Sequence, residues 1–207
     1  MTITATVYHG TADEIKEFSH DFIGQNTCNN AGGFYFTSDK DVAFDYSRDS
    51  YYRRHEDDLE YINNEKQLNE DTRKQQHIYE CEVTFENPLI LDIEEVERVD
   101  DYGCEKGMNV LDSAKICAIV NIMQGRQYEQ YMNYPIDDCV SVEDIYQYFE
   151  DEVWNEETQE YDYIEKEPYD GVIIHNAIDN CTEIYLMSDI YVALNPHQIT
   201  IKNRLTE

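Results

Sequence analysis

The chain has 207 residues, and 45 acidic against 15 basic side chains give it a formal net charge of -30. A surface this negative repels phosphate backbones, so we expect no direct binding to nucleic acid. It suits a basic or nucleic-acid-binding protein as a partner instead. The length allows one sizeable core and nothing in the chain resembles a linker, which predicts a single domain over residues 1–207.

Apolar runs in the sequence are too short to span a bilayer, and the first residues lack the pattern of a signal peptide. These features predict a cytoplasmic protein with no membrane partner. No C-x-x-C spacing occurs among the six cysteines, which are Cys28, Cys81, Cys104, Cys117, Cys139 and Cys181. We therefore expect free thiols, with neither a structural disulfide nor a metal site.

The first predicted element is an apolar strand that ends on His9 and is followed by the turn glycine Gly10 and by Thr11. Residues 12–18 predict a short turn of helix, because Ile15 and Phe18 then fall on one side of it. Residues 21–31 are rich in turn formers and predict a loop.

A glycine pair, Gly32 and Gly33, leads into a predicted strand at residues 34–37 that contains Tyr35. Ser38 and Asp39 are an N-cap pair, and residues 41–47 predict a helix that carries Tyr46 in its last turn. Glycines allow a close approach of backbone or ligand, and two tyrosines can bracket a flat ring. The stretch therefore predicts a pocket.

The middle of the chain mixes polar and apolar segments. Residues 47–76 predict a long solvent-facing helix or a partly mobile insertion, and residues 77–85 alternate as a half-buried strand does. A short apolar strand at residues 89–92 follows the Asn87-Pro88 turn. Residues 109–124 have the apolar spacing of a buried helix, and a helix-start signature at Ser141 predicts a second helix to about Trp154.

Residues 155–167 predict an acidic loop, and four strands are predicted at residues 171–175, 183–186, 189–194 and 199–201. Strands at both ends with helices between them indicate an α+β domain whose first and last strands meet in one core. Residues 137–170 hold fourteen carboxylates and only Lys166 as a positive charge. This acidic stretch is either a solvated face or a docking surface that mimics nucleic-acid charge.

Several of these signals occur together in a familiar order: residues 7–11, residues 32–37 with Tyr46 eleven positions after Tyr35, residues 169–174, and residues 189–199. In this combination the chain resembles ADP-ribosyltransferases of the histidine-tyrosine-glutamate class, which includes diphtheria toxin and the poly-ADP-ribose polymerases. It is most similar to the small versions found in phage and bacterial polyvalent proteins. The resemblance implies a split pair of mainly antiparallel β-sheets around an NAD cleft, with helical and acidic insertions at residues 47–76 and 93–168.

The resemblance also implies NAD as a co-substrate and a role for each matching residue. His9 would hold a ribose hydroxyl, the backbone of Gly10 would hold the nicotinamide amide, and Tyr35 and Tyr46 would stack on the nicotinamide ring. Thr11 and Gly33 complete the implied cofactor site. Read from the residues alone, His9 could equally be a strand-end histidine satisfied by backbone groups, and the tyrosines could be ordinary aromatic core in a chain with 18 tyrosines.

The catalytic set implied by the resemblance is His9, Tyr35 and the position of Ile190, where the polymerases carry a glutamate. An aliphatic residue there occurs in family members that transfer a single ADP-ribose unit. Asp189 is adjacent, but strand alternation points its side chain to the opposite face. The small hydroxyl residue that the family places three positions before the second tyrosine is replaced by Ala43.

Three function hypotheses follow. The leading one is a mono-ADP-ribosyltransferase that modifies a macromolecular target, as a phage-encoded factor such as an anti-defence or anti-CRISPR protein acting on a host protein. The alternative is a weak or inactive relative that binds a host protein through its acidic, nucleic-acid-mimicking surface. A third is an NAD glycohydrolase.

Overall fold

The computed structural model describes residues 2–22, 32–54, 64, 67, 70–71, 76–92, 119–120, 122–123, 147–178 and 187–205. This part of the chain is mostly β-sheet. Its elements, in order, are β1 (Ile3–Thr11), η1 (His20–Phe22), β2 (Phe34–Thr37), α1 (Lys40–Arg54), β3 (His77–Phe85), β4 (Pro88–Asp92), β5 (Glu150–Asn155), β6 (Glu160–Glu165), β7 (Gly171–Ile178), β8 (Met187–Ala193), η4 (Pro196–Gln198) and β9 (Ile199–Leu205).

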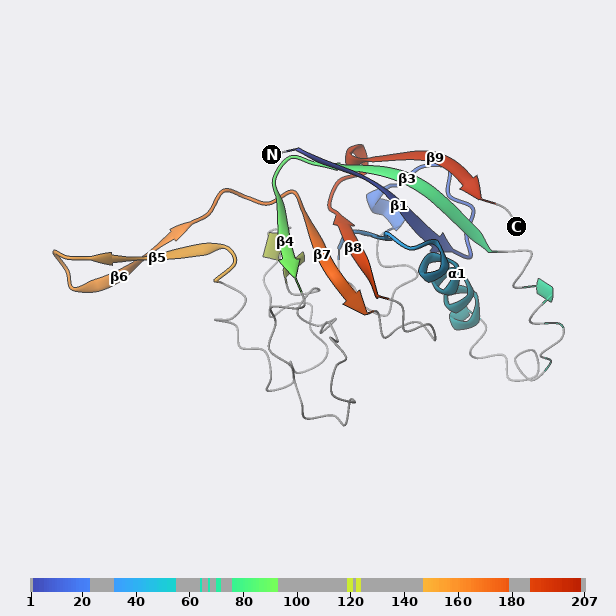
Figure 1. The fold of residues 1–207 in the computed structure, drawn as a ribbon, viewed down its shortest axis with the longest axis horizontal. Helices are drawn as coiled ribbons and strands as arrows, with labels where there is room; N and C mark the ends of the chain where they lie inside the picture. The colour runs from blue at the N-terminus through green and yellow to red at the C-terminus, as the bar shows by residue number, and fades with distance from the viewer. Residues whose placement is uncertain are drawn as a thin grey trace.

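Seven strands form one sheet in the order β4-β7-β8-β2-β1-β3-β9, and β5 and β6 form a separate hairpin (Figure 1). Within the large sheet β4 and β7 are parallel, and the other neighbours are antiparallel. The sheet therefore has the mainly antiparallel character that the sequence predicts. The strands of the two chain ends, β1 and β9, lie on either side of β3 (Figure 1).

The two halves of this sheet are joined at one residue pair. β1 pairs with β2 only where Tyr8 lies opposite Thr37, whereas β1 and β3 pair along their whole length. Beyond Tyr8 the ladder between β1 and β2 ends, so the remaining parts of their facing edges are not paired with each other. The predicted pair of sheets is thus a single sheet with one narrow joint among the described strands, and a cleft for NAD at that joint stays a prediction.

Each face of the sheet is covered by its own apolar cluster. One cluster contains Tyr79, Phe34 and Phe36 with neighbours from β1, β3 and β7, and Ile15 and Phe18 pack onto it. The other contains Ile190, Val192 and residues of β4 and β7, and Ile119 and Val120 cover it. Val172 and Ile174 on one face of β7 and Ile173 on the other are nearly inaccessible, as a strand covered on both faces requires.

Helix α1 begins where the sequence predicts a cap. The Asp39 carboxylate accepts a hydrogen bond from the backbone N–H of Asp41 at 2.7 Å, and Asp39 O accepts one from Ala43 N at 3.2 Å. This satisfies backbone donors that the first turn of a helix leaves without partners. The helix runs on to Arg54, so it includes the first part of the stretch predicted as an insertion.

A group of side-chain and backbone hydrogen bonds ties three turns together at the other end of the sheet. Gln198 Oε1 accepts from Leu194 N at 3.0 Å and Asn195 N at 2.9 Å, and Gln198 Nε2 donates to Asp170 O at 3.0 Å. The Asp170 carboxylate accepts from the backbone N–H groups of Glu86, at 2.7 Å, and Asn87, at 3.1 Å. Together these hydrogen bonds form a fold-stabilising clamp, which we call the Gln198 clamp.

Three predicted elements are wrong where the structure describes them. The predicted helix that ends near Trp154 is instead strand β5 from residue 150, and the predicted loop over residues 155–167 contains β6. Residues 12–18 contain no helix, although Ile15 and Phe18 do pack together on the sheet. The described part of the acidic stretch at residues 137–170 thus contains a β-hairpin in place of the predicted helix and loop.

Other predictions fall largely or wholly outside the described residues. These include the loop before Gly32, most of the polar stretch after α1 and the strand at residues 183–186. Of the predicted buried helix at 109–124, the described residues 119–120 and 122–123 are helical, and Ile119 and Val120 are fully buried.

Among the described residues Cys81 is free and buried, and burial followed by the nearby Glu80 charge raises the pKa of its thiol to about 12. The same residues contain no cluster that could hold a metal ion and no helix long and apolar enough to cross a bilayer.

Candidate active site

His9 lies at the joint between the two halves of the sheet. Its ring Nδ1 is 2.8 Å from the backbone oxygen of Tyr35, on the neighbouring strand β2. A carbonyl can only accept, so Nδ1 carries the proton and donates it. The side chain of His9 thereby takes the place of a backbone donor, at a point where β1 no longer pairs with β2.

The protonation state of His9 follows from its surroundings. Burial lowers the pKa of the imidazole, and the hydrogen bond to Tyr35 opposes this effect only in part. At neutral pH the ring is therefore uncharged, with its proton on Nδ1. Its Nε2 then carries a lone pair that can accept a hydrogen bond from a hydroxyl group.

Aromatic side chains surround the His9 ring. Phe18 packs edge-on against it, with ring centres 5.4 Å apart, and Phe36 lies at 5.6 Å. Phe18 also contacts Phe34, on which the ring of His20 stacks at 5.8 Å. His20 Nε2 in turn donates to Leu194 O at 2.9 Å, so the segment that follows β1 is fixed across the ends of β2 and β8. No spacing signal in the sequence points to His20, because its partner is a backbone group 174 positions away.

Gly10 is a point of close contact between β1 and α1. A Cβ atom added at Gly10 would lie 1.6 Å from the backbone oxygen of Ala43 and 3.0 Å from the backbone nitrogen of Ser47. The glycine is therefore required for helix packing, in addition to any role of its backbone toward a ligand. Thr11 is buried, and its hydroxyl accepts a hydrogen bond from Asp13 N at 3.1 Å, which shapes the turn after β1.

Tyr46 lies on α1 near the residues that contact β1. Ala43 and Ser47, both fully buried, make the close contact with Gly10, and Tyr46 follows Ala43 by three positions on the same side of the helix. Its side chain is partly buried. Tyr35 on β2 and Tyr46 on α1 thus lie on consecutive elements. The capped turn at Asp39 connects these two elements.

Tyr35 and Ile190 share a face of the sheet. Tyr35 lies opposite Val192 and Thr37 lies opposite Ile190, and directly opposed residues point to the same side. Tyr35 packs against the apolar cluster that contains Ile190, so the two positions are diagonal neighbours, about 7–8 Å apart in such a pairing. The ring of His9 lies by Phe36 on the other face and reaches only the backbone of Tyr35.

Gly33 enters β2 with φ +136°, a conformation that L-residues rarely adopt. A Cβ atom there would lie 2.9 Å from a methyl carbon of Val192. Both the backbone conformation and the space available therefore require glycine directly before Tyr35.

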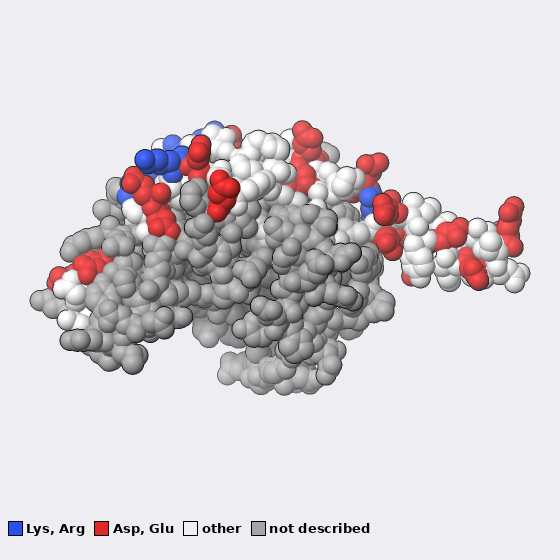
Figure 2. Space-filling view, turned by 180° about the vertical axis from the view of Figure 1, so that it is seen from behind, with Lys and Arg blue, Asp and Glu red and all other residues white. Residues whose placement is uncertain are grey.

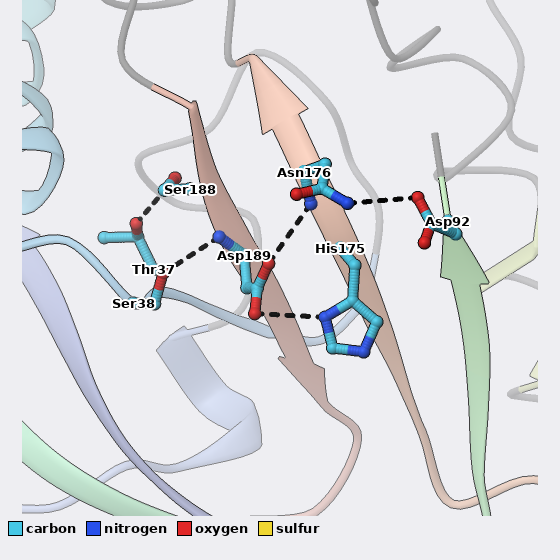
Figure 3. A network of polar contacts seen from close by, with 7 residues as sticks. All are labelled: Thr37, Ser38, Asp92, His175, Asn176, Ser188 and Asp189. Atoms are coloured by element: carbon cyan, nitrogen blue, oxygen red, sulfur yellow. Dashed lines mark hydrogen bonds and ion pairs between the residues drawn. The ribbon is translucent and has the colours of Figure 1, made fainter. Parts of the chain in front are cut away.

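Asp189 points away from Ile190, as strand alternation predicts, and organises a polar network (Figure 3). Its carboxylate accepts from His175 Nδ1 at 3.0 Å and from the backbone N–H of Asn176 at 3.1 Å. Burial and the neighbouring Asp189 charge raise the pKa of Tyr191. Ser38 bonds both backbone groups of Asp189, which fixes the start of β8 against the end of β2.

Sequence reasoning missed His175 and Asn176. Asn176 has φ 58° at a bulge in β7, and its side chain donates to Asp92 at 3.1 Å. An asparagine after an apolar run was the available signal, since asparagine tolerates the left-handed region better than most residues. The network has a positional effect, because it fixes the strand that carries Ile190.

The site as a whole offers one ring nitrogen that can accept a hydrogen bond and a partly buried tyrosine beside an apolar position. Glu183, which belongs to the strand predicted at residues 183–186, lies outside the described residues. Such a site can bind and orient a polar ligand with a flat ring. In the described part of the face that Tyr35 shares with Ile190, apolar residues surround the position of the expected glutamate.

Comparison with known proteins identifies the family. A family model described as ADP-ribosyltransferase in polyvalent proteins matches residues 4–204 of the chain. No curated protein and no solved structure matches it. The match covers β1 through β9 and so includes His9, Tyr35, Tyr46 and Ile190. The chain therefore belongs to the family of ADP-ribosyltransferases found in polyvalent proteins.

Proposed function

We propose that this protein is a mono-ADP-ribosyltransferase that cleaves NAD and transfers one ADP-ribose unit to a protein. The single observation that carries the proposal is the bond between His9 Nδ1 and Tyr35 O at the open joint of the sheet. It brings together two residues that the family motif requires, although they are 26 positions apart in the chain.

The chemistry of the joint suits a dinucleotide. A ribose hydroxyl is a hydrogen-bond donor, and the neutral His9 ring presents Nε2 as an acceptor. A ligand that contacts both His9 and the ring of Tyr35 has to cross the open edge between β1 and β2, because these side chains lie on different faces. An extended molecule with two riboses and a flat nicotinamide ring meets that requirement.

The nicotinamide end would lie on the face of Tyr35. There we place the ring between Tyr35 and Tyr46, with the backbone of Gly10 toward the amide and with Gly33 and Thr11 shaping the entrance. Stacking on aromatic rings binds a flat, electron-poor ring and excludes water from it. Water exclusion strengthens each polar contact in the site.

The reaction breaks the bond between the nicotinamide nitrogen and the ribose carbon. Nicotinamide leaves with the electron pair, the ribose carbon develops positive charge, and an acceptor atom of the target bonds to that carbon and gives up a proton. Ile190 offers no carboxylate to stabilise the positive charge or to orient a second ADP-ribose. We therefore assign a single transfer, in which the charge of the acceptor supplies part of the stabilisation.

We further propose that the target is a basic protein of a bacterial host, and that the enzyme is a phage-encoded anti-defence factor acting in the cytoplasm. The net charge of -30 supports a basic partner, because it favours encounter with positive surfaces. The similarity to small phage and bacterial enzymes supports the choice of host.

One observation favours a second candidate function. Ile190 is 9% exposed and belongs to an apolar cluster, which suits an inactive relative that only binds its partner. NAD hydrolysis without a protein acceptor is a third candidate function, and one experiment distinguishes all three.

The test is to incubate the purified protein with isotopically labelled NAD and bacterial extract, and to measure protein masses and free nicotinamide. Transfer predicts nicotinamide release together with one labelled ADP-ribose on specific proteins. Release without labelled protein would identify a glycohydrolase, and neither product would identify a binder. Boiled enzyme is the control for spontaneous attachment of ADP-ribose.

A further inference from the structure

The hairpin formed by β5 and β6 projects from the body of the protein (Figure 1). Its strands pair over six positions, and its turn is well defined: Asn155 Oδ1 accepts from Glu157 N at 2.9 Å and Thr158 N at 3.2 Å, and Gln159 has φ 57°. The hairpin is thus a formed element and not an extended loop.

Strand register divides the hairpin into two different faces. Trp154 lies opposite Tyr161, with ring centres 5.0 Å apart, and Glu152 lies opposite Tyr163. Because opposed residues share a face, one side carries the three aromatic residues Trp154, Tyr161 and Tyr163, and we call it the aromatic face. The other side carries Val153 and Ile164 among polar residues.

The aromatic face is exposed to solvent. Trp154 is 50% exposed, Tyr161 56% and Tyr163 63%. Three large aromatic side chains side by side on a projecting element are uncommon without a partner, since burying them stabilises an interface strongly. A two-stranded hairpin is also only marginally stable by itself in water, so a partner would stabilise it further.

The base of the hairpin holds it in place while leaving this face open. Lys166 Nζ donates to Gln147 O at 3.0 Å and lies 3.2 Å from Asp151, and Lys166 N donates to Phe149 O at 2.7 Å. Phe149 and Tyr169 contact each other and pack onto the apolar cluster around Ile190. These contacts link the hairpin to the sheet face that carries Tyr35.

The charge of the hairpin selects the kind of partner. Residues 150–165 contain eight carboxylates and no lysine or arginine. Figure 2 shows acidic residues distributed along the projecting hairpin, around side chains that are neither acidic nor basic. A second copy of this chain would bring the same negative charges together. The complementary surface is therefore a basic one on another protein.

We propose that the aromatic face of the hairpin binds a partner protein through a segment in which arginine or lysine alternates with apolar residues. The apolar residues of that segment pack on Trp154, Tyr161 and Tyr163, and its cations pair with Glu150, Glu152 and Glu165 on the same face. The statement that this partner is also the ADP-ribose acceptor rests on the proposed transferase activity. Binding itself requires no NAD.

Trp154 is the single tryptophan of the chain, so its fluorescence reports on the hairpin directly. Two synthetic peptides of equal positive charge are titrated without NAD, one alternating arginine with leucine and the other arginine with serine. The arginine-leucine peptide is expected to shift Trp154 emission to shorter wavelength, to protect it from acrylamide quenching and to weaken with added salt. The arginine-serine peptide is expected to bind at least about tenfold more weakly.

Matched variants distinguish the two faces. Tyr161→Ser with Tyr163→Ser is expected to weaken arginine-leucine binding by about tenfold or more, whereas Val153→Ser with Ile164→Ser on the opposite face leaves it within about twofold. Glu152→Gln with Glu165→Gln tests the charges without unfolding the hairpin, because Glu150 and Glu165 face each other and repel. This variant is expected to bind more weakly.

Equal binding of both peptides without an emission shift, or equal losses from both faces, would overturn the proposal. Self-association of the protein without peptide, detected by sedimentation, would identify a second copy as the occupant and would also overturn it. Because no step uses NAD, a protein that binds as expected but transfers no ADP-ribose would refute the proposed function and leave the hairpin assignment standing.

Discussion

His9 shows how one residue links the fold to the site. Burial lowers the pKa of His9, so the unfolded chain binds the proton more tightly than the folded protein does. The stability that depends on the neutral ring is therefore complete above about pH 6.5 and is lost as the pH falls from about 6.5 toward the folded pKa. For one group this loss is at most about 1.4 kcal/mol per pH unit.

The variant His9→Gln tests this loss of stability with falling pH, because glutamine can donate to the Tyr35 carbonyl but does not titrate. We expect the stability difference between wild type and variant, from urea unfolding between pH 7 and pH 5, to shrink or reverse as the pH falls. His77→Gln is the positive control at a different place in the fold. Burial also lowers the pKa of His77, which lies beside Arg204. A constant difference for His9→Gln across this range would contradict the account.

Ile190 is the residue that limits catalysis in this account. Ile190→Glu is expected to raise nicotinamide release from NAD, because the carboxylate would face a positively charged ribose. It is also expected to destabilise the fold, since a carboxylate at a buried apolar position loses hydration. Ile190→Gln has a similar size without the charge and should not increase release. Equal release by the glutamate and glutamine variants, both shown to be folded, would place the site elsewhere.

Gly10 is the third residue whose substitution tests the structure. In Gly10→Ala the new methyl group meets the Ala43 carbonyl, so α1 has to move away from β1. We expect a loss of about 1–3 kcal/mol or more in the free energy of unfolding. Thr6→Ala, at an exposed position of the same strand, serves as the control in urea unfolding. If Gly10→Ala unfolds like Thr6→Ala, the close contact does not hold in solution.

Among the elements, most described strands and the start of α1 could be predicted from the sequence. Strand β3 alternates in polarity, and the Asp39 cap needs only neighbouring residues. The hairpin could not be predicted, because the apolar spacing of Tyr148, Phe149 and Val153 imitates a helix. In the structure Phe149 is an anchor on the body, whereas Val153 belongs to a projecting strand.

The Gln198 clamp is tested by one substitution. Gln198→Ala removes the acceptor of two backbone N–H groups, at Leu194 and Asn195, and the donor to Asp170. Leaving such groups unpaired costs about 1–3 kcal/mol each, so the two N–H groups predict a loss of roughly 2–6 kcal/mol in unfolding free energy. Asn203→Ala on β9, which removes an exposed hydrogen bond to Glu80 on β3, should change stability by less than about 0.5 kcal/mol. Similar losses in both variants would show that the clamp contributes little.

For the whole molecule, the sequence indicated the family but not the sheet order. The insertion of β2 between β8 and β1, and the parallel pairing of β4 with β7, depend on contacts between residues far apart in the chain. Local patterns carry no information about such pairings. The same limit applies to the site: the motif spacing indicated Tyr35 and His9, while the faces to which they point required the strand register.

The proposed division of the molecule places NAD at the joint of the sheet and the partner on the hairpin. The two regions meet where Phe149 and Tyr169 pack on the apolar cluster around Ile190. A partner bound to the hairpin could therefore reach the ribose from the face of Tyr35. In this proposed arrangement the excess of acidic residues selects the target. Cleavage of the bond between nicotinamide and ribose takes place at a separate, neutral site.

Labelling of protein by Tyr35→Ala tests the central claim most directly. The variant, Tyr35→Phe and wild type are incubated with labelled NAD and bacterial extract, and ADP-ribosylated protein is quantified by mass spectrometry. Loss of the ring is expected to raise the barrier by roughly 2–4 kcal/mol, or about 30- to 1,000-fold in rate, while Tyr35→Phe keeps the stacking surface and most of the activity. Undiminished labelling by a folded Tyr35→Ala protein would contradict the assignment of β2 as the NAD site.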